Sequence, residues 1–430
     1  MRVGYKLTEV GVIPEDWNNT SLCELVDQNR KITYGIVVPG PAIYDGVPLI
    51  RAQDYSKGWV DLEDLYRVSH TIDKAYKRSK VITGDVLLTI VGSVGNIAKV
   101  PQTFDDSNIT QQTARLSFNP EVADADYYLN VLLSDVGRKA IANFTKSGVQ
   151  PSLNLSDVEK FILPLPPLTE QRAIAQALSD VDALLTTLDQ MIAKKRDLKQ
   201  AAMQQLLTGK TRLPGFGGEW EISTLGQICS FENGDRSSNY PSPESFRQSG
   251  IPFINAGHIA GGNISTNEMN YITQEAYDRL GGGKVKAGDI LFCLRGSLGK
   301  FGLVSSNFGY GAIASSLVII RPKGAVVSRE YLLCYFSSTL CAQMIETWSG
   351  GAAQPNLGGK ELARFIIQLP PIPEQTATAK ILTDMDAELS ALETRRDKTR
   401  NIKQAMMQEL LTGKTRLIAK EKSHASATPL

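Results

Sequence analysis

The sequence has few of the residues that build disulfide frameworks or metal sites. Its 430 residues include five cysteines and three histidines, with no CxxC pair. We therefore expect no metal site and no disulfide scaffold, and this cysteine usage is typical of a reducing cytosol. No apolar run has the length of a membrane span, and the opening MRVGYKLTEV has no signal-peptide core, so a cytoplasmic protein is expected. The net charge of +1 does not indicate a partner held by bulk electrostatics.

A recognisable catalytic constellation is also missing. LLTGKTRL occurs twice, but Gln204 and Gln408 stand where a phosphate-binding loop needs its first glycine. Gly209 and Gly413 fit helix C-caps in left-handed conformation instead. The two Pro-Pro pairs lack the polar acceptor and the aromatic ring of an adenine methyltransferase, and no glycine-rich turn after a strand suits S-adenosylmethionine. We therefore expect a non-catalytic chain that holds no cofactor of its own.

What the sequence does contain is a duplication. Segments recur at an offset of 204 positions, which slips by one near the front, where DW at 16–17 aligns with EW at 219–220. The pattern is a tandem repeat of a unit of roughly 200 residues. The matched positions include Pro48 and Pro252, Gly84 and Gly288, Gln150 and Gln354, Pro166 and Pro370, Glu170 and Glu374, and Leu207 and Leu411.

Each repeat begins with a stretch typical of a globular domain. Glycine, proline, asparagine and serine break it into short β-branched and aromatic runs such as VITGDVLLTIVG, TARLSF, DILFCLRG and SSLVIIRP. Short helical stretches such as ADYYLNVLLSDVGRKAIANF and REYLLCYFSSTLCAQMIETW interrupt these runs. The pattern predicts an α+β fold with a mainly antiparallel sheet in each repeat.

Each repeat ends in a long helical stretch. Apolar residues recur there in alternating steps of four and three, which predicts a coiled-coil seam on a helix about 55 Å long. The matching stripe of the other repeat is the expected partner, around a pseudo-twofold axis; two separate surface helices are the alternative. The predicted seam residues are Ile174, Leu178, Val181, Leu185, Leu188 and Ile192 in the first copy, and Leu382, Met385, Leu389 and Leu392 in the second.

These features resemble a known family. PLPPLTEQRAIAQAL and LPPIPEQTATAKIL, each at the start of a long helix, resemble the conserved regions of type I restriction–modification specificity subunits. So do the strand-turns GDVLLTIVGSVGN and GDILFCLRGSLGK and the segments SGVQPSLNL and GGAAQPNLG. The resemblance covers roughly residues 5–417. The second copy departs at two positions: Pro373 stands where the first copy has Thr169, and Thr378 occupies a seam position. Both predict a looser start of the second helix.

The resemblance implies a domain plan and a set of partners. Two target-recognition domains, two long helices forming an antiparallel coiled coil, and an asymmetric bipartite DNA target are implied. The implied partners are double-stranded DNA, two methyltransferase subunits and restriction motor-nuclease subunits, with S-adenosylmethionine, ATP and Mg²⁺ used by those subunits. The predicted domains are residues 1–165 and 214–369 for target recognition, 166–213 and 370–417 for the long helices, and 418–430 for a disordered tail.

Base edges are read by amides and arginine, and phosphates by lysine and arginine. Polar loop residues of these types are candidates for DNA contacts, although Gln150 and Gln354 also fit a structural role because both repeats keep them. The candidates are Lys31, Tyr34, Arg51, Gln53, Lys77, Arg78, Gln111, Gln112, Lys146 and Gln150 in the first repeat, and Arg236, Asn239, Asn255, His258, Arg295, Ser297, Lys300, Gln354 and Asn356 in the second.

Other functions stay open from the residues alone. A stand-alone bivalent DNA-binding protein would need no partner subunit. A self-contained methyltransferase or nuclease would need motifs that the chain lacks. A purely structural adaptor does not explain why polar loop residues differ between the repeats while helices and turn glycines match.

Overall fold

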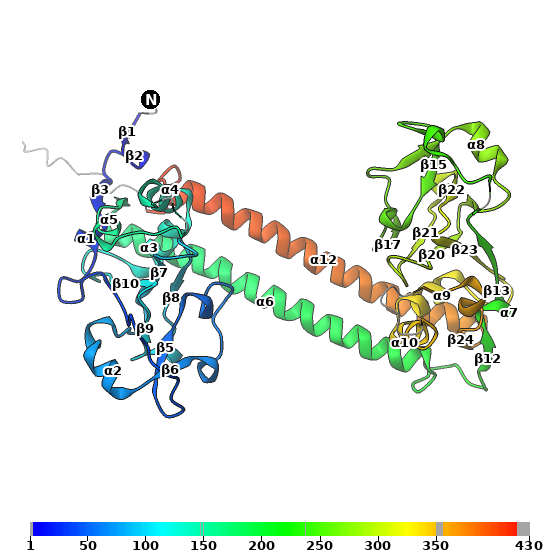
Figure 1. Cartoon of the computed structure of the whole chain (residues 1–430), viewed down its shortest axis with the longest axis horizontal. Coiled ribbons are helices and arrows are strands. Elements are labelled where there is room, and N and C mark those ends of the chain that lie inside the picture. The colour runs from blue at the N-terminus through cyan, green and yellow to red at the C-terminus, as the bar shows by residue number, and fades with distance from the viewer. Residues whose placement is uncertain (1–2, 147, 149, 237, 350–355, 419–430) are drawn as a thin grey trace, which may run out of the picture. The chain divides into compact units, whose positions relative to one another are not determined.

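The computed structural model describes residues 3–146, 148, 150–236, 238–349 and 356–418. The chain divides into two compact units: unit 1 is Met1–Leu188 with Arg395–Leu430, and unit 2 is Asp189–Thr394. Each unit joins one globular part to portions of two long helices, α6 (Leu168–Leu207) and α12 (Ile372–Leu410) (Figure 1). The tail predicted at residues 418–430 lies, except for Ile418, outside the described residues.

Antiparallel pairing dominates the sheets of unit 1, as the sequence predicted. The described residues form a four-stranded sheet in the order β4-β10-β7-β8 and a three-stranded sheet in the order β6-β5-β9, whose β5–β9 pair is parallel. Two-stranded pairs β1-β2 and β3-β11 complete the unit. The strands are β1 Tyr5–Thr8, β2 Gly11–Pro14, β3 Asn18–Ser21, β4 Thr33–Tyr34, β5 Val47–Ile50, β6 Tyr66–Val68, β7 Val86–Thr89, β8 Ile97–Lys99, β9 Asn108–Ile109, β10 Thr113–Leu116 and β11 Ile162–Leu165.

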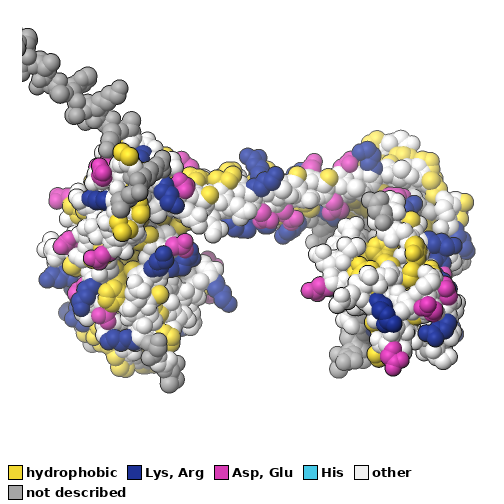
Figure 2. Space-filling model, turned by 90° about the horizontal axis from the view of Figure 1, so that it is seen from above, with side chains coloured by type: hydrophobic (Ala, Val, Ile, Leu, Met, Phe, Trp, Pro, Cys, Tyr) yellow, Lys and Arg dark blue, Asp and Glu magenta, His cyan; other side chains and the backbone are white. Residues whose placement is uncertain are grey.

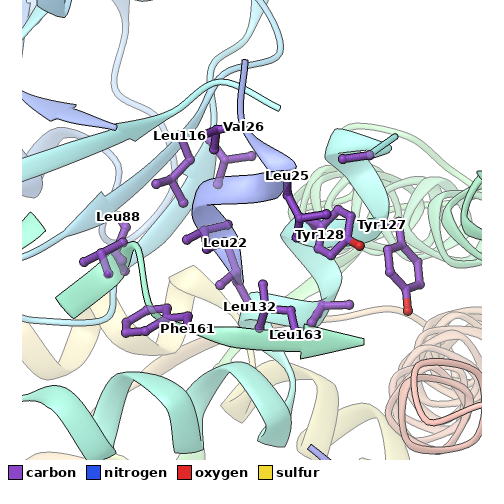
Figure 3. Packing of buried hydrophobic residues seen from close by; sticks show 14 of the residues in the cluster. Leu22, Leu25, Val26, Leu88, Leu116, Tyr127, Tyr128, Leu132, Phe161 and Leu163 are labelled. Atoms are coloured by element: carbon purple, nitrogen blue, oxygen red, sulfur yellow. The ribbon is translucent and has the colours of Figure 1, made fainter. Parts of the chain in front are cut away.

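The main core of unit 1 lies between its larger sheet and its helices. Leu88 of β7 and Leu116 of β10 pack with Tyr128, Leu132 and Phe161, and all five side chains are nearly or fully buried (Figure 3). The cluster extends to the start of α6 and the end of α12, so the long helices share the core of the globular part. The shorter helices of the unit are α1 Leu22–Leu25, α2 His70–Ala75, α3 Ala125–Leu133, α4 Asp135–Phe144 and α5 Leu155–Val158, with 3₁₀ turns η1 Ala52–Asp54, η2 Leu62–Asp64, η3 Lys77–Ser79 and η4 Gln102–Phe104.

Unit 2 repeats this plan with larger sheets. Its described strands form sheets in the orders β13-β23-β20-β21-β17-β16 and β14-β18-β15-β22-β19, plus the pair β12-β24. The strands are β12 Glu221–Thr224, β13 Cys229–Asn233, β14 Phe246–Arg247, β15 Ile251–Ile254, β16 Ile259–Ala260, β17 Gly262–Ile264, β18 Asn270–Ile272, β19 Lys284–Lys286, β20 Ile290–Cys293, β21 Phe301–Leu303, β22 Tyr310–Ile313, β23 Leu317–Pro322 and β24 Ile366–Leu369. The helices are α7 Leu225–Ile228, α8 Gln274–Arg279, α9 Arg329–Phe336, α10 Thr339–Trp348 and α11 Gly359–Leu362, with 3₁₀ turns η5 Pro243–Ser245, η6 Ala256–His258 and η7 Ser306–Phe308.

Both long helices end as the sequence predicted. Gly209 and Gly413 follow α6 and α12 with φ of +66°, the left-handed conformation of a helix C-cap. Every predicted seam residue is buried or half-buried, whereas Leu184 and Ile381 beside the seam are exposed. The apolar residues that recur on average every 3.5 positions therefore form the buried face of these helices.

Ion pairs join α6 to α12 in each unit, and those of unit 2 show that the helices run antiparallel there. In unit 1, Lys403 of α12 lies 2.6 Å from Asp182 of α6. In unit 2, Lys195 of α6 lies 2.5 Å from Glu388 of α12, and the pair one turn further along joins Lys199 to Asp386. The partner's number falls as the lysine's number rises, which is the signature of an antiparallel pair.

Equivalent glutamines attach the start of each long helix to its globular part. Gln171 accepts a hydrogen bond from the Asp124 N–H and donates to the Val122 and Pro166 carbonyls. Gln375 makes the corresponding bonds to the Ser328 N–H and to the Val326 and Pro370 carbonyls. The expectation of a looser start for the second helix is therefore wrong, because the glutamine bonds are unchanged and proline is compatible with the first turn of a helix.

Candidate nucleic-acid interface

In unit 1, the ends of three strands meet and present polar side chains together. The Thr110 N–H donates to the Ile50 carbonyl at the end of β5 (3.2 Å), and the Ile90 N–H after β7 donates to the Gln112 carbonyl (2.7 Å). The Leu153 N–H donates to the Ile90 carbonyl (2.8 Å), which brings the 150–153 segment to the same place. We call the resulting patch the strand-end surface of unit 1; its polar members are Arg51, Gln53, Ser93, Gln111, Gln112 and Gln150.

The amides of this surface are available to a ligand. Gln53, Gln111, Gln112 and Gln150 are all exposed. The Gln111 N–H and the Gln112 carbonyl are engaged in backbone bonds that fix the loop, while the side-chain amides extend from it. Amide side chains on a fixed backbone are suited to pairing with adenine edges.

Arg51 is held in one orientation. It is the N-cap of the 3₁₀ turn η1, and Asp54 at the third position of that turn accepts from the Arg51 backbone N–H (2.8 Å). The same carboxylate accepts from Arg51 Nε (3.1 Å) and Nη2 (3.0 Å), and the guanidinium carbon lies 5.6 Å from the centre of the Tyr66 ring. Asp54 is 2 % exposed, so its charge is compensated almost wholly by this arginine.

Unit 2 builds the same framework from equivalent residues. The Ala314 N–H donates to the Ile254 carbonyl (2.7 Å), and the Leu294 N–H donates to the Ser316 carbonyl (2.9 Å). The Leu357 N–H donates to the Leu294 carbonyl (3.0 Å). We call this patch the strand-end surface of unit 2; its polar members are Asn255, Arg295, Ser297, Ser315, Ser316 and Asn356.

The two surfaces differ in their side chains although their backbones correspond. Asn255 replaces Arg51, and serines replace both glutamines of the loop after β9. The arginine of unit 2 comes from another strand end: Arg295 follows β20, is exposed, and donates through Nε to the Asn356 side-chain oxygen (2.9 Å). The chain therefore carries one scaffold with two different sets of donors and acceptors.

His258 does not belong to the surface of unit 2, which corrects the sequence-based expectation. It is 5 % exposed, its Nδ1 accepts from the Asn255 N–H (3.0 Å), and its Nε2 lies 3.2 Å from the Glu268 carbonyl. It occupies the place of Asp54 in the capping turn, so its role is structural. The turn buries the imidazole, a feature that loop composition alone could not predict.

The remaining candidates are not members of the two strand-end surfaces. Arg236 is exposed and donates to the Ser315 carbonyl (3.1 Å), and Lys300 lies in the turn that contains Ser297. Tyr34 is half-buried against the main core of unit 1. Lys31, Lys77, Arg78, Lys146 and Asn239 are exposed, and Gln354 lies outside the described residues.

Reasoning from the sequence missed two kinds of residue. Asp54 is not among the residues predicted from the sequence, yet it accepts from both the backbone N–H and the guanidinium of Arg51. Gln171 and Gln375 are not among the residues predicted from the sequence, yet they attach the helices to the globular parts. Their recurrence 204 positions apart is the sequence signal that identifies these two glutamines.

Basic and acidic side chains lie close together on the surfaces of the globular parts. Figure 2 shows Lys and Arg side chains interspersed with Asp and Glu over the drawn face of each globular part. Within the described ranges, no three His, Cys, Asp or Glu side chains gather as metal ligands, and no helix is long and apolar enough to cross a membrane. Burial raises the pKa of Cys229 and Cys341 to about 12, so these thiols stay protonated at neutral pH.

Comparison with known proteins finds relatives along the whole chain. The model described as "Type I restriction modification DNA specificity domain" matches residues 14–196 and again residues 217–400. The type I restriction enzyme EcoBI specificity subunit of Escherichia coli is 34% identical over 204 residues, which is 46% of this chain and 43% of that one. The putative type I restriction enzyme MjaX specificity subunit of Methanocaldococcus jannaschii is 27% identical over 426 residues, covering 96% of this chain and 97% of its own.

A solved structure has a similar fold. The crystal structure of the type I restriction–modification S subunit from M. genitalium aligns with a TM-score of 0.56 at 17% identity, covering 94% of this chain and 97% of that one. The similarity therefore extends over both repeats and both long helices.

Proposed function

The chain belongs to the type I restriction–modification DNA specificity family, and we propose that it recognises an asymmetric bipartite DNA target, one half through each unit. The family model matches each repeat separately, which supports one reading domain per repeat. The observation that carries the proposal is the pair of strand-end surfaces. Three backbone hydrogen bonds recur at equivalent positions while the polar side chains around them differ, as expected for two readers of different sequences.

We propose that the chain directs chemistry performed by other subunits. Two methyltransferase subunits would use S-adenosylmethionine, and restriction subunits would use ATP and Mg²⁺. Shared DNA binding also fits the net charge of +1, because a reader that works alone needs many basic contacts with phosphates.

A stand-alone bivalent DNA-binding protein is the second candidate. It is favoured by the fact that each unit has its own core and its own strand-end surface. It predicts tight, sequence-specific binding by the purified chain, whereas a specificity subunit needs its methyltransferase for tight binding. Titrating a DNA duplex with the chain, alone and with the methyltransferase subunits, separates these functions.

The proposed function is tested by mapping methylated adenines in DNA from cells that carry the chain with its methyltransferase. Exchange of residues 220–365 for the equivalent segment of a relative should change one half of the target and leave the other half intact. A matched control is Arg138→Ala, which removes an exposed arginine of α4 that lies on neither strand-end surface. If the exchange alters both halves, or neither, the assignment of one half-target to each unit is wrong.

A further inference from the structure

Arg51 of the strand-end surface of unit 1 has one side occupied and one side available. A guanidinium carries five N–H donors in a planar fork. Asp54 engages Nε and one hydrogen of Nη2 along one edge of that fork. Among the described residues, Nη1 has no acceptor, and the side chain of Arg51 is 32% exposed. The edge formed by Nη1 and Nη2, which we call the outward edge, therefore keeps two parallel donors that Asp54 does not occupy.

The environment of Arg51 fixes this edge in place. Asp54 is itself held by the Arg51 backbone N–H, so the pair closes a ring through the backbone. The Tyr66 ring lies beside the guanidinium, and the Tyr66 hydroxyl donates to the Gly40 carbonyl (2.6 Å). A side chain restrained on two sides loses little rotamer freedom when it binds a ligand.

The same arrangement separates base reading from phosphate binding. Asp54 cancels the charge of Arg51, so attraction to the phosphate backbone is weak while the directional donors remain. Guanine offers two adjacent acceptors, O6 and N7, on its major-groove edge, and a bidentate arginine matches them. Adenine presents a donor beside N7, which opposes the second N–H of the fork.

From this geometry we propose that the outward edge of Arg51 reads a guanine in the half-target of unit 1, with Asp54 as the residue that positions it. The proposal rests on the proposed function, because it specifies one base within the target of unit 1. The counterpart of Arg51 in unit 2 is Asn255, so guanine reading at this place is specific to unit 1.

The chain itself supplies the variant that separates positioning from structure. His258 replaces Asp54 in unit 2 and still accepts the N–H of the capping residue through Nδ1 (3.0 Å). Asp54→His should therefore keep the hydrogen bond that caps the turn while losing the carboxylate that holds the guanidinium. Asp54→Asn is a smaller alternative that keeps one acceptor for the backbone and removes the charge.

The experiment selects bound sequences from randomised duplexes with the full chain in complex with its methyltransferase subunits. Wild type should select a bipartite motif with a guanine in the half assigned to unit 1. Arg51→Lys, which keeps the charge but loses the fork, should reduce the preference for that guanine about 10- to 100-fold. Asp54→His and Asp54→Asn should reduce it several-fold, and Arg138→Ala, which breaks another Arg–Asp pair, should change nothing.

The second half of the motif is an internal control for folding, because each variant should read it as wild type does. If Arg51→Lys and Asp54→Asn leave every base preference intact, the proposal is overturned. Uniformly weaker binding, with a smaller salt dependence and unchanged preferences, would likewise overturn it by making Arg51 a phosphate contact. Failure of the wild-type complex to select any sequence would instead overturn the proposed function and this proposal with it.

Discussion

The junction between the long helices and the globular part is built twice, once from one continuous segment and once from two segments that are far apart in the sequence. In unit 2, residues 208–220 run directly from the end of α6 into the globular part. In unit 1, the corresponding place joins residues 411–417 after α12 to residues 5–17, which begin the chain. The two junctions differ in whether the backbone or side-chain contacts connect the end of the helix to the globular part.

A buried ion pair is common to both junctions. Glu374 accepts from Arg212 Nε (2.6 Å) and Nη2 (2.7 Å), and Glu170 accepts from Arg416 at the same two distances. Both glutamates are 1 % exposed. Loss of Arg212 or Arg416 would leave a buried carboxylate without this counter-charge, so the pair specifies this arrangement in both units.

The open junction has additional contacts. Arg416 also donates to both oxygens of Asp16 (2.9 and 2.8 Å), and Trp17 Nε1 donates to Glu170 (2.9 Å). In unit 2, Arg212 donates instead to the carbonyls of Gly217 and Gly218. Side chains in unit 1 thus provide the cohesion that the backbone provides in unit 2.

The largest effect should come from the shared packing of the helices in both units. Leu178 and Leu382 occupy equivalent seam positions and are 0 % exposed. Leu178→Ala and Leu382→Ala should each lower the free energy of unfolding by about 3 kcal/mol, because each leaves a cavity in a core. Denaturant unfolding measures this loss.

Exposed neighbours provide matched controls for these variants. Leu184→Ala and Ile381→Ala remove side chains that are 38% exposed, so each should change stability by less than about 0.5 kcal/mol. If the core variants lower the free energy of unfolding by no more than these controls do, the assignment of Leu178 and Leu382 to a buried seam is wrong.

The second largest effect should come from the buried glutamates of the two junctions. Glu170→Gln should lower the free energy of unfolding by about 2 kcal/mol, and Glu374→Gln by about 1 kcal/mol. The difference follows because Glu170 holds both chain ends, through Trp17 and Arg416, whereas unit 2 keeps its backbone connection. Thermal unfolding of the two variants compares them.

Glu388→Gln is the control for this pair, because Glu388 is exposed in its ion pair with Lys195 and should contribute under about 0.5 kcal/mol. Equal losses for Glu170→Gln and Glu374→Gln would show that the open junction does not depend more on its side chains.

The long helices are more predictable from the sequence than the strand-end surfaces. A seam such as Leu178 to Ile192 repeats over many turns, so its period identifies the helix and its buried face. The meeting of Arg51 with Gln111 depends on β5 pairing in parallel with β9 across a long loop, and no local pattern specifies that pairing. Burial of His258 depends on a capping turn of three residues, which composition does not reveal.

The third largest effect should come from the hydrogen bond between Trp17 and Glu170 in unit 1. Trp17 and Trp220 occupy equivalent positions, but Trp220 Nε1 is buried without an acceptor among the described residues. Trp17→Phe should therefore lower the free energy of unfolding by about 1 kcal/mol more than Trp220→Phe, because only Trp17 loses a bond to a carboxylate. Paired denaturation curves test the difference; a larger loss for Trp220→Phe would contradict it.

The smallest effect concerns acid stability, in which the units also differ. Burial alone would raise the pKa of Glu232, but hydrogen bonds from Arg321 and from the Gly283 and Lys284 N–H groups lower it below its ordinary value of 4.5. A depressed pKa in the folded state stabilises the fold above pH 4.5, and this contribution disappears as the pH falls through the folded pKa. Because Glu232 is one-third exposed, we expect Glu232→Gln to cost only about 0.5 kcal/mol at pH 7, with the difference from wild type shrinking below pH 4.5. Thr33 pairs with Arg115 in unit 1 as Glu232 pairs with the equivalent Ile319 in unit 2. It carries no titrating group, so the effect of Thr33→Ala should be constant over the same range. Denaturation of the three proteins from pH 7 to pH 3 measures both trends, and a Glu232→Gln difference that grows in acid would show that this carboxylate does not stabilise unit 2 through its ionised form.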